Sequence, residues 1–535
     1  MRASKNLPVT WALLPLFAAV ALPAQANVFI STQPTSNMSC SGGVCAPTAQ
    51  PANLNTTDLA HMLASSDVTV MSGNDTSRRD IVVKSTLGWA SSHRLTLDAN
   101  YAVTIDAPIV VHGPGGLTVT RHRFPGDLTF GPGGHVAFWD LSSSFVLNGV
   151  AFTLVGDIGG LAGAIAANSA GNFALAGDVK PTTLYTASPI PTTFNGVLEG
   201  LGNRILYLRI NDTAANQHDG LFATIGSTGK IRDLGLVNAK VQGTSGSLIG
   251  TLAGESDGGI LRSYATGMVL HTGSGGYLGG MVGWSMGGIS NSYSEASVRG
   301  QQNISAGGIA GAMSHYGTTP NDYLRASGDV TAGNGSSAGG LVGTNTAAIG
   351  FAQASGNVTA GSGSFAGGLV GQGRGGYVAV FATGAVKVGN LGTAGGLQGR
   401  LDGQGETDSY ATGSVTGGAR SVLGSLFGEC CNSATYPMYH GYGIGAVSGG
   451  PQSTIGGVVG HDDGLEKNWL DVYWDTDTTG VGNLSQGAGN IVNDPGISGL
   501  SDAQLKAGLP PGFSGWGQNA AINNGYPYLL ENPPQ

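Results

Sequence analysis

The sequence predicts an all-β protein whose main part is a right-handed parallel β-helix, in which short strands wind into stacked coils. The first supporting observation is a five-residue phrase that reads Gly-Gly-Leu-Val-Gly at 339–343 and 367–371 and returns every 28 to 33 residues. The second is another phrase between these copies, which reads Ser-Tyr-Ala-Thr-Gly at 263–267 and 409–413. The third is composition, because 94 of 535 residues are glycine, and each glycine inside a helix costs roughly 1 kcal/mol.

The copies of the first phrase share an apolar third residue. We expect the paired glycines to form corners of the coils, where φ is often positive and no Cβ can fit. One repeat cannot bury its apolar face alone, so these positions predict a continuous core along stacked repeats. The copies end at Gly250, Gly283, Gly311, Gly343, Gly371, Gly399, Gly428 and Gly460, and their third residues are Leu248, Met281, Ile309, Leu341, Leu369, Leu397, Leu426 and Val458.

The second phrase has a valine two residues after its end and a small residue two residues before its end. In a strand these two positions share a face, because side chains alternate with a period of two. Small and β-branched residues in register suit the narrow interior of a coiled sheet. The valines are Val269, Val298, Val330, Val358, Val386, Val415 and Val447, and the small residues are Ala265, Ser294, Ala326, Ala354, Ala382, Ala411 and Gly443.

These two phrases in alternation resemble the GLUG motif of bacterial secreted proteins. The closing segment, with Val-Tyr-Trp-Asp-Thr-Asp-Thr-Thr-Gly at 472–480 and Gly-Tyr-Pro-Tyr-Leu at 525–529, is similar to the end of such arrays in filamentous-haemagglutinin-like adhesins. The likeness covers residues 195–530 and marks the fold more specifically than the function, since no chemistry is assigned to the repeat. It implies a secreted or cell-surface adhesin-like protein of a Gram-negative bacterium.

Changes in composition divide the chain into five segments. We expect a signal peptide at 1–26, a low-complexity leader at 27–79 with one short helix at 57–65, and irregular β coils at 80–194 on the axis of the main solenoid. The repeat β-helix then occupies 195–465, and a capping segment occupies 466–535. Within that cap, Trp469 and Trp474 are expected to close the end of the core.

The first 26 residues have the pattern of a secretory signal. Arg2 and Lys5 precede an apolar stretch at 11–22, and Ala-Gln-Ala at 24–26 is a small-x-small cleavage site. The alternative is a membrane anchor, although the apolar stretch is short, and no later stretch approaches the roughly 18 apolar residues of a spanning helix. The net charge is −9 and the chain has no run of Lys or Arg, so nucleic acid is not an expected partner.

Four cysteines form two local pairs, in keeping with an oxidising compartment. Four residues lie between Cys40 and Cys45, and we predict a disulfide that joins these two cysteines. Cys430 and Cys431 are adjacent, which leaves a vicinal disulfide and free or separately paired thiols as alternatives. No further Cys or His pair has the spacing of a metal site, and we predict no metal and no cofactor.

An enzyme site on a β-helix would need clustered carboxylates on one outer face. The acids of the repeats do not recur at the repeat period, and only Asp402, Glu406 and Asp408 lie close together in sequence. We therefore predict no catalytic residue. The segment 471–480 resembles part of a calcium loop, but Gln486 stands where a bidentate glutamate is needed. A capping turn is the preferred interpretation of that segment, and calcium is the alternative.

A column of aromatic residues is the sequence feature that most strongly indicates a binding surface. One residue before each small position, the chain places an aromatic side chain on the face opposite the valines, with Arg325 and Gln353 interrupting the series. An exposed column would be a platform for glycan or protein contacts, and the alternative is a structural ladder of stacked rings. Its members are Tyr264, Tyr293, Phe381, Tyr410 and Tyr442.

These features predict an exported, non-catalytic, adhesin-like interaction protein of a bacterial cell surface or secretome. Its expected partners are glycans or proteins of host cells or matrix. The first alternative is a carbohydrate-active β-helix enzyme, such as a polysaccharide lyase or hydrolase. The second is a structural spacer or matrix protein that binds no host ligand.

Overall fold

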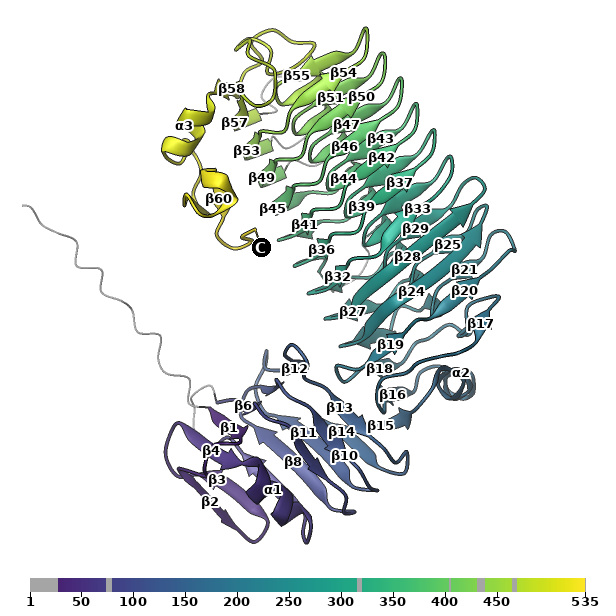
Figure 1. Cartoon of the computed structure of the whole chain (residues 1–535), viewed down its shortest axis with the longest axis vertical. Coiled ribbons are helices and arrows are strands. Elements are labelled where there is room, and N and C mark those ends of the chain that lie inside the picture. Colours follow the sequence, from purple (N-terminus) through teal and green to yellow (C-terminus); the bar gives the residue numbers. More distant parts are fainter. Residues whose placement is uncertain are drawn as a thin grey trace, which may run out of the picture.

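The protein is a β-solenoid of parallel, stacked strands (Figure 1). The computed structural model describes residues 27–73, 79–314, 320–403, 406–430, 438–463 and 469–534, so the signal peptide predicted at 1–26 lies outside the described residues. The strands wind into about 16 turns. Long sheets run along the solenoid, one with 20 strands and two with 9 strands each. The predicted all-β parallel β-helix is confirmed.

Each coil of the repeat block contributes short strands to three sheets. In the coil that starts at Gln353, β41 (Gln353–Ala354) and β42 (Val358–Ala360) belong to the 20-stranded sheet. The next two strands, β43 (Phe365–Gly367) and β44 (Val370–Gly373), belong one to each 9-stranded sheet. These two sheets run from β21 (His218–Asp219) to β55 (Thr454–Gly456) and from β22 (Phe222–Ile225) to β56 (Val459–Asp462).

The predicted valines form one inward file. Each valine pairs in parallel register with the valine of the next coil, from Val269 to Val447, and all seven are buried. The small residues stack in the same way beside them, from Ala265 to Gly443. The strands that carry the valines besides β42 are β28 (Tyr264–Thr272), β33 (Ser297–Arg299), β37 (Val330–Ala332), β46 (Val386–Val388), β50 (Val415–Gly417) and β54 (Val447–Gly449).

The glycines of the first phrase are required by close packing of the backbone. A Cβ on Gly367 would lie 2.0 Å from Val370 O, and one on Gly368 would lie 2.1 Å from Gly396 O in the next coil. Neither glycine has a positive φ. The expectation that these glycines supply left-handed corners is therefore wrong, while the expectation that no Cβ fits is confirmed.

The first copy of this phrase lies four residues later than predicted. Strand β26 (Ala253–Ser256) pairs Ala253 with Val282 of β30 (Val282–Ser285), so residues 250–254 align with 279–283. The apolar third residue of this copy is Leu252, and Leu248 pairs with Tyr277 instead. The prediction failed because Ser-Leu-Ile-Gly at 247–250 has nearly the same pattern of small and apolar residues as the true copy.

The predicted low-complexity leader at 27–79 is wrong, because its described part is folded into the N-terminal coils. Strand β1 (Val28–Ser31) pairs in parallel with β4 (Ala52–Asn55) and β6 (Ile81–Val83). Val28 and Leu54 are fully buried in the N-terminal core. The many Ser, Thr, Pro and Asn residues of this segment conceal the short apolar alternations on which its strands depend.

The short helix predicted at 57–65 is present as α1 (Thr56–Leu63). Its N-cap is Asn55, whose side chain accepts from the backbone nitrogens of Thr57 and Asp58. The coils that follow complete the N-terminal block. Their strands are β5 (Val68–Met71), β7 (Leu87–Trp89), β8 (Arg94–Ala99), β9 (Val103–Ile105), β10 (Ile109–Val111), β11 (Gly116–Arg121), β12 (Leu128–Phe130), β13 (Val136–Phe138) and β14 (Ser144–Leu147).

The chain reverses direction between the N-terminal block and the repeat block. Strand β14 pairs antiparallel with β15 (Val150–Val155) through an Asn148-Gly149 turn in which both residues have positive φ, as a type I′ hairpin requires. The two blocks have separate cores, and Leu154 belongs to the first while Val155 belongs to the second. Figure 1 shows the blocks meeting at an angle. The expectation of one shared axis is therefore wrong, and the coils of the second core begin before residue 195.

Both ends of the repeat core are closed by bulky side chains. Helix α2 (Ile158–Ala167) buries Leu161 and Ile165 against the first coils. At the other end Trp474 takes the register position of the small residues, next to Gly443, and its Nε1 donates to Val481 O at 2.8 Å. Trp469 is buried in the same core, so the predicted closure by these two tryptophans is confirmed.

Candidate ligand-binding face

One register position of the 20-stranded sheet forms a continuous outer column. Each member pairs with the equivalent residue of the next coil, so all five predicted aromatic residues stand in one line. The column is Arg204 in β19 (Arg204–Leu206), Gly235 in β24 (Gly235–Thr244), Tyr264 in β28, Tyr293 in β32 (Tyr293–Ser294), Arg325 in β36 (Arg325–Ala326), Gln353 in β41, Phe381 in β45 (Tyr377–Ala382), Tyr410 in β49 (Glu406–Ala411), Tyr442 in β53 (Met438–Gly443) and Tyr473 in β57 (Trp469–Asp475).

We call Phe381, Tyr410, Tyr442 and Tyr473 the covered half of the outer column. The rings of Phe381 and Tyr410 are stacked 4.8 Å apart, and those of Tyr410 and Tyr442 are 5.2 Å apart. Tyr410 and Tyr442 are fully buried. The C-terminal segment, residues 497–534, folds back beside these coils (Figure 1, yellow). It contains β58 (Ile497–Leu500), α3 (Asp502–Ala507), β59 (Trp516–Gly517) and β60 (Tyr528–Leu529).

The C-terminal segment packs aromatic side chains against the covered half. The Trp516 ring lies 5.8 Å from Tyr410 and 5.9 Å from Tyr442, and Phe513 lies 4.5 Å from Trp516. Together with Tyr526 these residues form a third apolar cluster, separate from the two solenoid cores. Aromatic pairs of this kind contribute about 0.5–1.5 kcal/mol each beyond the area they bury.

Hydrogen bonds fix the segment in place. Tyr442 Oη donates to Pro527 O at 2.6 Å, and Trp516 Nε1 donates to Asp408 Oδ1 at 2.8 Å. Near the chain end, Asn532 Nδ2 donates to the carbonyl oxygens of Ala352 and Ala379. The segment therefore extends along the column to the coil of Gln353, where Asn532 binds the carbonyl oxygen of Ala352.

Burial under the segment changes the acidity of the covered tyrosines. Loss of solvent disfavours the phenolate, so burial raises the pKa of Tyr410 and Tyr442 above the ordinary value. The same effect, with the neighbouring Asp471 carboxylate, raises the pKa of Tyr473 to about 12. All three remain neutral at physiological pH.

We call Tyr264, Tyr293, Arg325 and Gln353 the open half of the outer column. The rings of Tyr264 and Tyr293 are stacked 4.9 Å apart and are nearly parallel, at 4°. Tyr293 is 37% exposed, against 0% for Tyr410 and Tyr442. Because Arg325 follows in the next coil, Tyr293 is the last ring of this stack, and no column ring covers its second face.

Two adjoining hollows follow the open half, and we call them together the trough. The larger has a volume of about 560 Å³ and extends from the loop at 130–135 of the N-terminal block to Tyr293. The smaller has a volume of about 300 Å³ and lies over Tyr293, Arg325 and Gln353. Tyr293 lines both. The loop closes one end of the trough, and the C-terminal segment, anchored on Ala352, lies at the other.

The charged groups of the trough are balanced in sign. Arg204 pairs with Asp178 at 2.6 Å and Arg262 pairs with Asp233 at 2.7 Å. The smaller hollow is lined by two further residues of opposite charge, Arg325 and Glu295. Three cations thus face three carboxylates, and the lining carries no net charge when His135 is neutral.

Ion pairs join the residues next to the larger hollow to the N-terminal block. Arg262 Nη1 lies 3.0 Å and Arg232 Nη2 lies 2.7 Å from Asp127 Oδ2. Burial opposes the charge of Asp127, but the two guanidinium groups outweigh it and hold the pKa of this carboxyl below its ordinary value. Behind them, burial and the nearby Asp233 raise the pKa of Glu199 well above its usual range. These contacts join the two blocks beside the trough.

A second aromatic pair lies next to the interruption of the column. Tyr323 and Phe351 stand two residues before Arg325 and Gln353, and their rings stack 4.9 Å apart at 12°. Both residues have positive φ, at 52° and 51°. Tyr323 is 47% exposed. Sequence reasoning missed this pair because it does not belong to either phrase.

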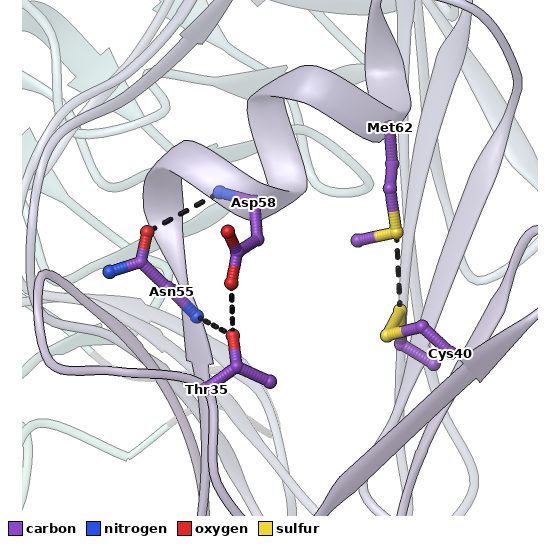
Figure 2. Close-up of a disulfide and its surroundings, with 6 residues drawn as sticks. Thr35, Cys40, Asn55, Asp58 and Met62 are labelled. Carbon is purple, nitrogen blue, oxygen red and sulfur yellow. Dashed lines mark hydrogen bonds between the residues drawn. A yellow bond between two sulfur atoms is a disulfide. The ribbon is translucent and has the colours of Figure 1, made fainter.

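The predicted disulfide between Cys40 and Cys45 is present in the N-terminal block (Figure 2). It joins β2 (Met38–Ser41) and β3 (Val44–Pro47), and Met62 Sδ of α1 lies 4.0 Å from Cys45 Sγ. At the start of α1, Thr35 Oγ1 donates to Asp58 Oδ2 at 2.6 Å. Cys431 lies outside the described residues, so the structure does not distinguish the alternatives stated for Cys430 and Cys431.

The segment 471–480 forms the predicted capping turn. Asp475 Oδ1 accepts from the backbone nitrogens of Asp477 and Thr478 at 2.8 and 3.1 Å. Asp475 Oδ2 accepts from Tyr526 Oη of the C-terminal segment at 2.9 Å. The Asp475 carboxylate therefore shapes the turn and also holds the segment that covers the column.

Two of the carboxylates that are close in sequence have different partners. Asp402 accepts from Arg400 Nε at 2.7 Å, and Asp408 accepts from Trp516; the side chain of Glu406 lies outside the described residues. Within the described ranges, no group of three or more His, Cys, Asp or Glu side chains is arranged to hold a metal ion. Over the same ranges, no helix has the length and apolar character needed to cross a membrane.

Comparisons with known proteins assign no family to the chain. No family model matches the sequence, and no curated protein matches it. A solved structure from Bacteroides ovatus, of a protein provisionally assigned as an immunoglobulin A1 protease, is similar to the chain at 17% identity and a TM-score of 0.31. The alignment covers 71% of this chain and 93% of that one. A likeness this distant does not assign a function.

Proposed function

We propose that the protein is an exported, non-catalytic, adhesin-like interaction protein that binds its ligand in the trough. One observation carries the proposal: stacked tyrosines of the outer column are exposed in a hollow, whereas the equivalent rings farther along the same column are covered. Exposed aromatic groups that line a hollow, with a few polar groups around them, are typical of binding sites.

Three further observations support export to a bacterial surface or secretome. The repeats resemble the GLUG motif of bacterial secreted proteins, and the first 26 residues have the pattern of a secretory signal. The Cys40–Cys45 disulfide suits an oxidising compartment. Fractionation of the source bacterium, with the chain followed by antibody, tests the location; retention in the cytoplasm would contradict it.

A binding role is supported over catalysis by the state of the trough carboxylates. Asp178 and Asp233 are each paired with an arginine at 2.7 Å or less, so the carboxylates that line the larger hollow already have partners. Incubation of the protein with polysaccharides, followed by reducing-end and unsaturated-uronate assays, tests this point. Release of products that depends on a trough carboxylate would establish the enzyme alternative instead.

The binding role itself is tested on host-cell surfaces and extracellular matrix. We expect the full chain to bind, and Tyr293→Ala to weaken binding by removing the exposed ring. The matched control is Tyr207→Ala, because Tyr207 is 47% exposed but does not line the trough. Equal loss in both variants would place the binding site outside the trough, and no binding by the unaltered chain would favour the spacer alternative.

A further inference from the structure

We propose that the trough binds an uncharged oligosaccharide, with the second face of Tyr293 as the platform for one sugar ring. This inference rests on the proposed function and names the ligand class for the same site. It depends on the chemical contrast between the two halves of the outer column, on the polar groups of the smaller hollow, and on the charge balance of the lining.

The covered half shows what an apolar stretch of this column binds. Its rings contact Phe513, Trp516 and Tyr526, so an aromatic polypeptide occupies it. The smaller hollow of the open half differs, because apart from Tyr293 and Ala326 its lining is polar. A second aromatic peptide would leave those polar groups without partners, which is costly. The open half is therefore suited to a ligand with one apolar face and many hydroxyl groups.

The geometry of Tyr293 provides the apolar contact. Tyr264 covers one face of the ring at 4.9 Å, and the smaller hollow opens on the side of Arg325. The C–H groups on one face of a pyranose ring carry partial positive charge and match the negative face of an aromatic ring. The stack behind Tyr293 holds the platform in place.

The groups around the platform provide both donors and acceptors. Arg325 has only donors, Glu295 has only acceptors, and the Gln353 amide has both; all three line the smaller hollow with the hydroxyls of Ser327 and Ser355. A sugar hydroxyl donates and accepts, so it needs neighbours of both kinds. Coil spacing places Tyr264 and Gln353 about 14 Å apart, three steps of roughly 4.8 Å each. This distance leaves room for more than one sugar ring.

The balance of charge identifies the ligand as uncharged. The three arginines of the lining face three carboxylates, so an anionic sugar would lie as close to carboxylates as to guanidinium groups. Two of the arginines already donate to their carboxylates. Uronic, sulfated or sialylated glycans would gain no net attraction here.

The test uses the full chain and an array of defined glycans. The neutral probes are oligomers of glucose, galactose, mannose and N-acetylglucosamine with two to six units, and the acidic probes are their uronic, sulfated and sialylated counterparts. We expect binding to neutral oligomers, with affinity that changes less than about twofold between 50 and 500 mM salt, because no charge pair forms across the interface. Selective binding to acidic probes, with affinity that falls as salt rises, would overturn the inference.

Variants locate the site. Tyr293→Ala should weaken binding to the best neutral oligomer by roughly tenfold or more, as loss of a central aromatic contact does. Tyr293→Phe keeps the ring and should retain most of the affinity, and Gln353→Ala should lose several-fold. Tyr207→Ala is the control and should bind normally. The three substituted side chains are exposed or partly exposed, and unchanged thermal unfolding would show that the four variants fold.

The outcomes separate this inference from the proposed function. If Tyr293→Ala abolishes binding to cells, but periodate oxidation of the cell glycans does not, the ligand is a protein and the saccharide inference fails while the binding function stands. If the chain binds neither cells nor any probe, both fail. Neutral-glycan binding that is insensitive to Tyr293→Ala would place the site elsewhere and overturn the inference.

Discussion

The two halves of the outer column have the same register, the same sheet and the same kind of stacked ring, yet they differ in what lies over them. Tyr410 and Tyr442 are fully buried beneath the C-terminal segment, while Tyr264 and Tyr293 line a hollow. Ring spacing is nearly equal, at 5.2 Å in the covered half and 4.9 Å in the open half. Stacking along a solenoid is therefore set by the coil repeat, and burial is set separately by the segment that crosses the coils.

The comparison also separates structural from binding roles within a single series of residues. A ring in the covered half contributes to stability through its contacts with Trp516 and its neighbours. A ring in the open half has fewer contacts and leaves surface for a ligand. Substitutions at equivalent positions should therefore change different properties of the protein.

The largest expected effect is on stability in the covered half. Tyr442→Ala removes a fully buried ring and its hydrogen bond to Pro527, and should destabilise the last coils by about 3–5 kcal/mol. Tyr293→Ala, at the equivalent position of the open half, should cost less than about 1 kcal/mol. Thermal unfolding followed by circular dichroism and by limited proteolysis measures both. Similar losses in the two variants would contradict the distinction between the halves.

A smaller effect is expected from the indole that anchors the cover. Trp516→Phe keeps an aromatic ring but removes the hydrogen bond to the Asp408 carboxylate, a loss of about 1.5–3 kcal/mol. Amide hydrogen exchange should then rise in residues 497–534, with little change at Tyr264 and Tyr293. Trp139→Phe, on an exposed indole of the N-terminal block, should leave that segment protected. Loss of protection along the whole repeat block would argue against a separate cover.

The stability of the covered half should also decrease at alkaline pH. Burial and the nearby Asp471 raise the pKa of Tyr473 to about 12, against an ordinary value of about 10. The folded chain holds this proton more tightly than the unfolded chain, so the stabilisation is complete below about pH 10 and is lost as pH rises toward 12. Tyr473→Phe should lose less stability than the unaltered chain across that interval. Tyr207→Phe should lose as much stability as the unaltered chain over the same interval. Identical curves of stability against pH for all three proteins would contradict the raised pKa of Tyr473.

The smallest expected change in stability comes from making the open half resemble the covered half. Arg325→Tyr would place a ring over the second face of Tyr293, at a position where the register already stacks equivalent residues. We expect a stabilisation of about 0.5–1.5 kcal/mol at most, together with loss of binding in the smaller hollow. Arg325→Gln, which adds no ring, is the control. Retained binding with a filled platform would show that the ligand does not use the Tyr293 face.

The core of the repeat block was predictable because its signal recurs. Val298 and Val330 stand at the same offset from a repeated phrase, so one alternation assigns a face to every coil. The outer column follows from the same register. The two interpretations of the aromatic series, ladder and platform, could not be separated in this way, because both require the same alternation. The ladder describes the covered half, and the platform is our proposal for the open half.

The cover was not predictable because it does not repeat. Asn532 reaches the carbonyl of Ala352 across 180 residues of sequence, and no periodic pattern in the C-terminal segment indicates that contact. The junction between the blocks left a signal that was missed. Asn148-Gly149 between apolar alternations indicates a tight hairpin, which is incompatible with coils that continue in one direction. A polar composition similarly concealed the strands around Val28 and Leu54.

The C-terminal segment starts from the last coil, and its own length sets how far back it extends. Coils contact only their neighbours, so a gain or loss of one unit of about 28 residues ahead of Ala352 would leave the cover unchanged. It would lengthen or shorten the uncovered stretch by one rung of about 4.8 Å. Variation in unit number would then change the length of the trough, and with it the number of sugar rings that fit.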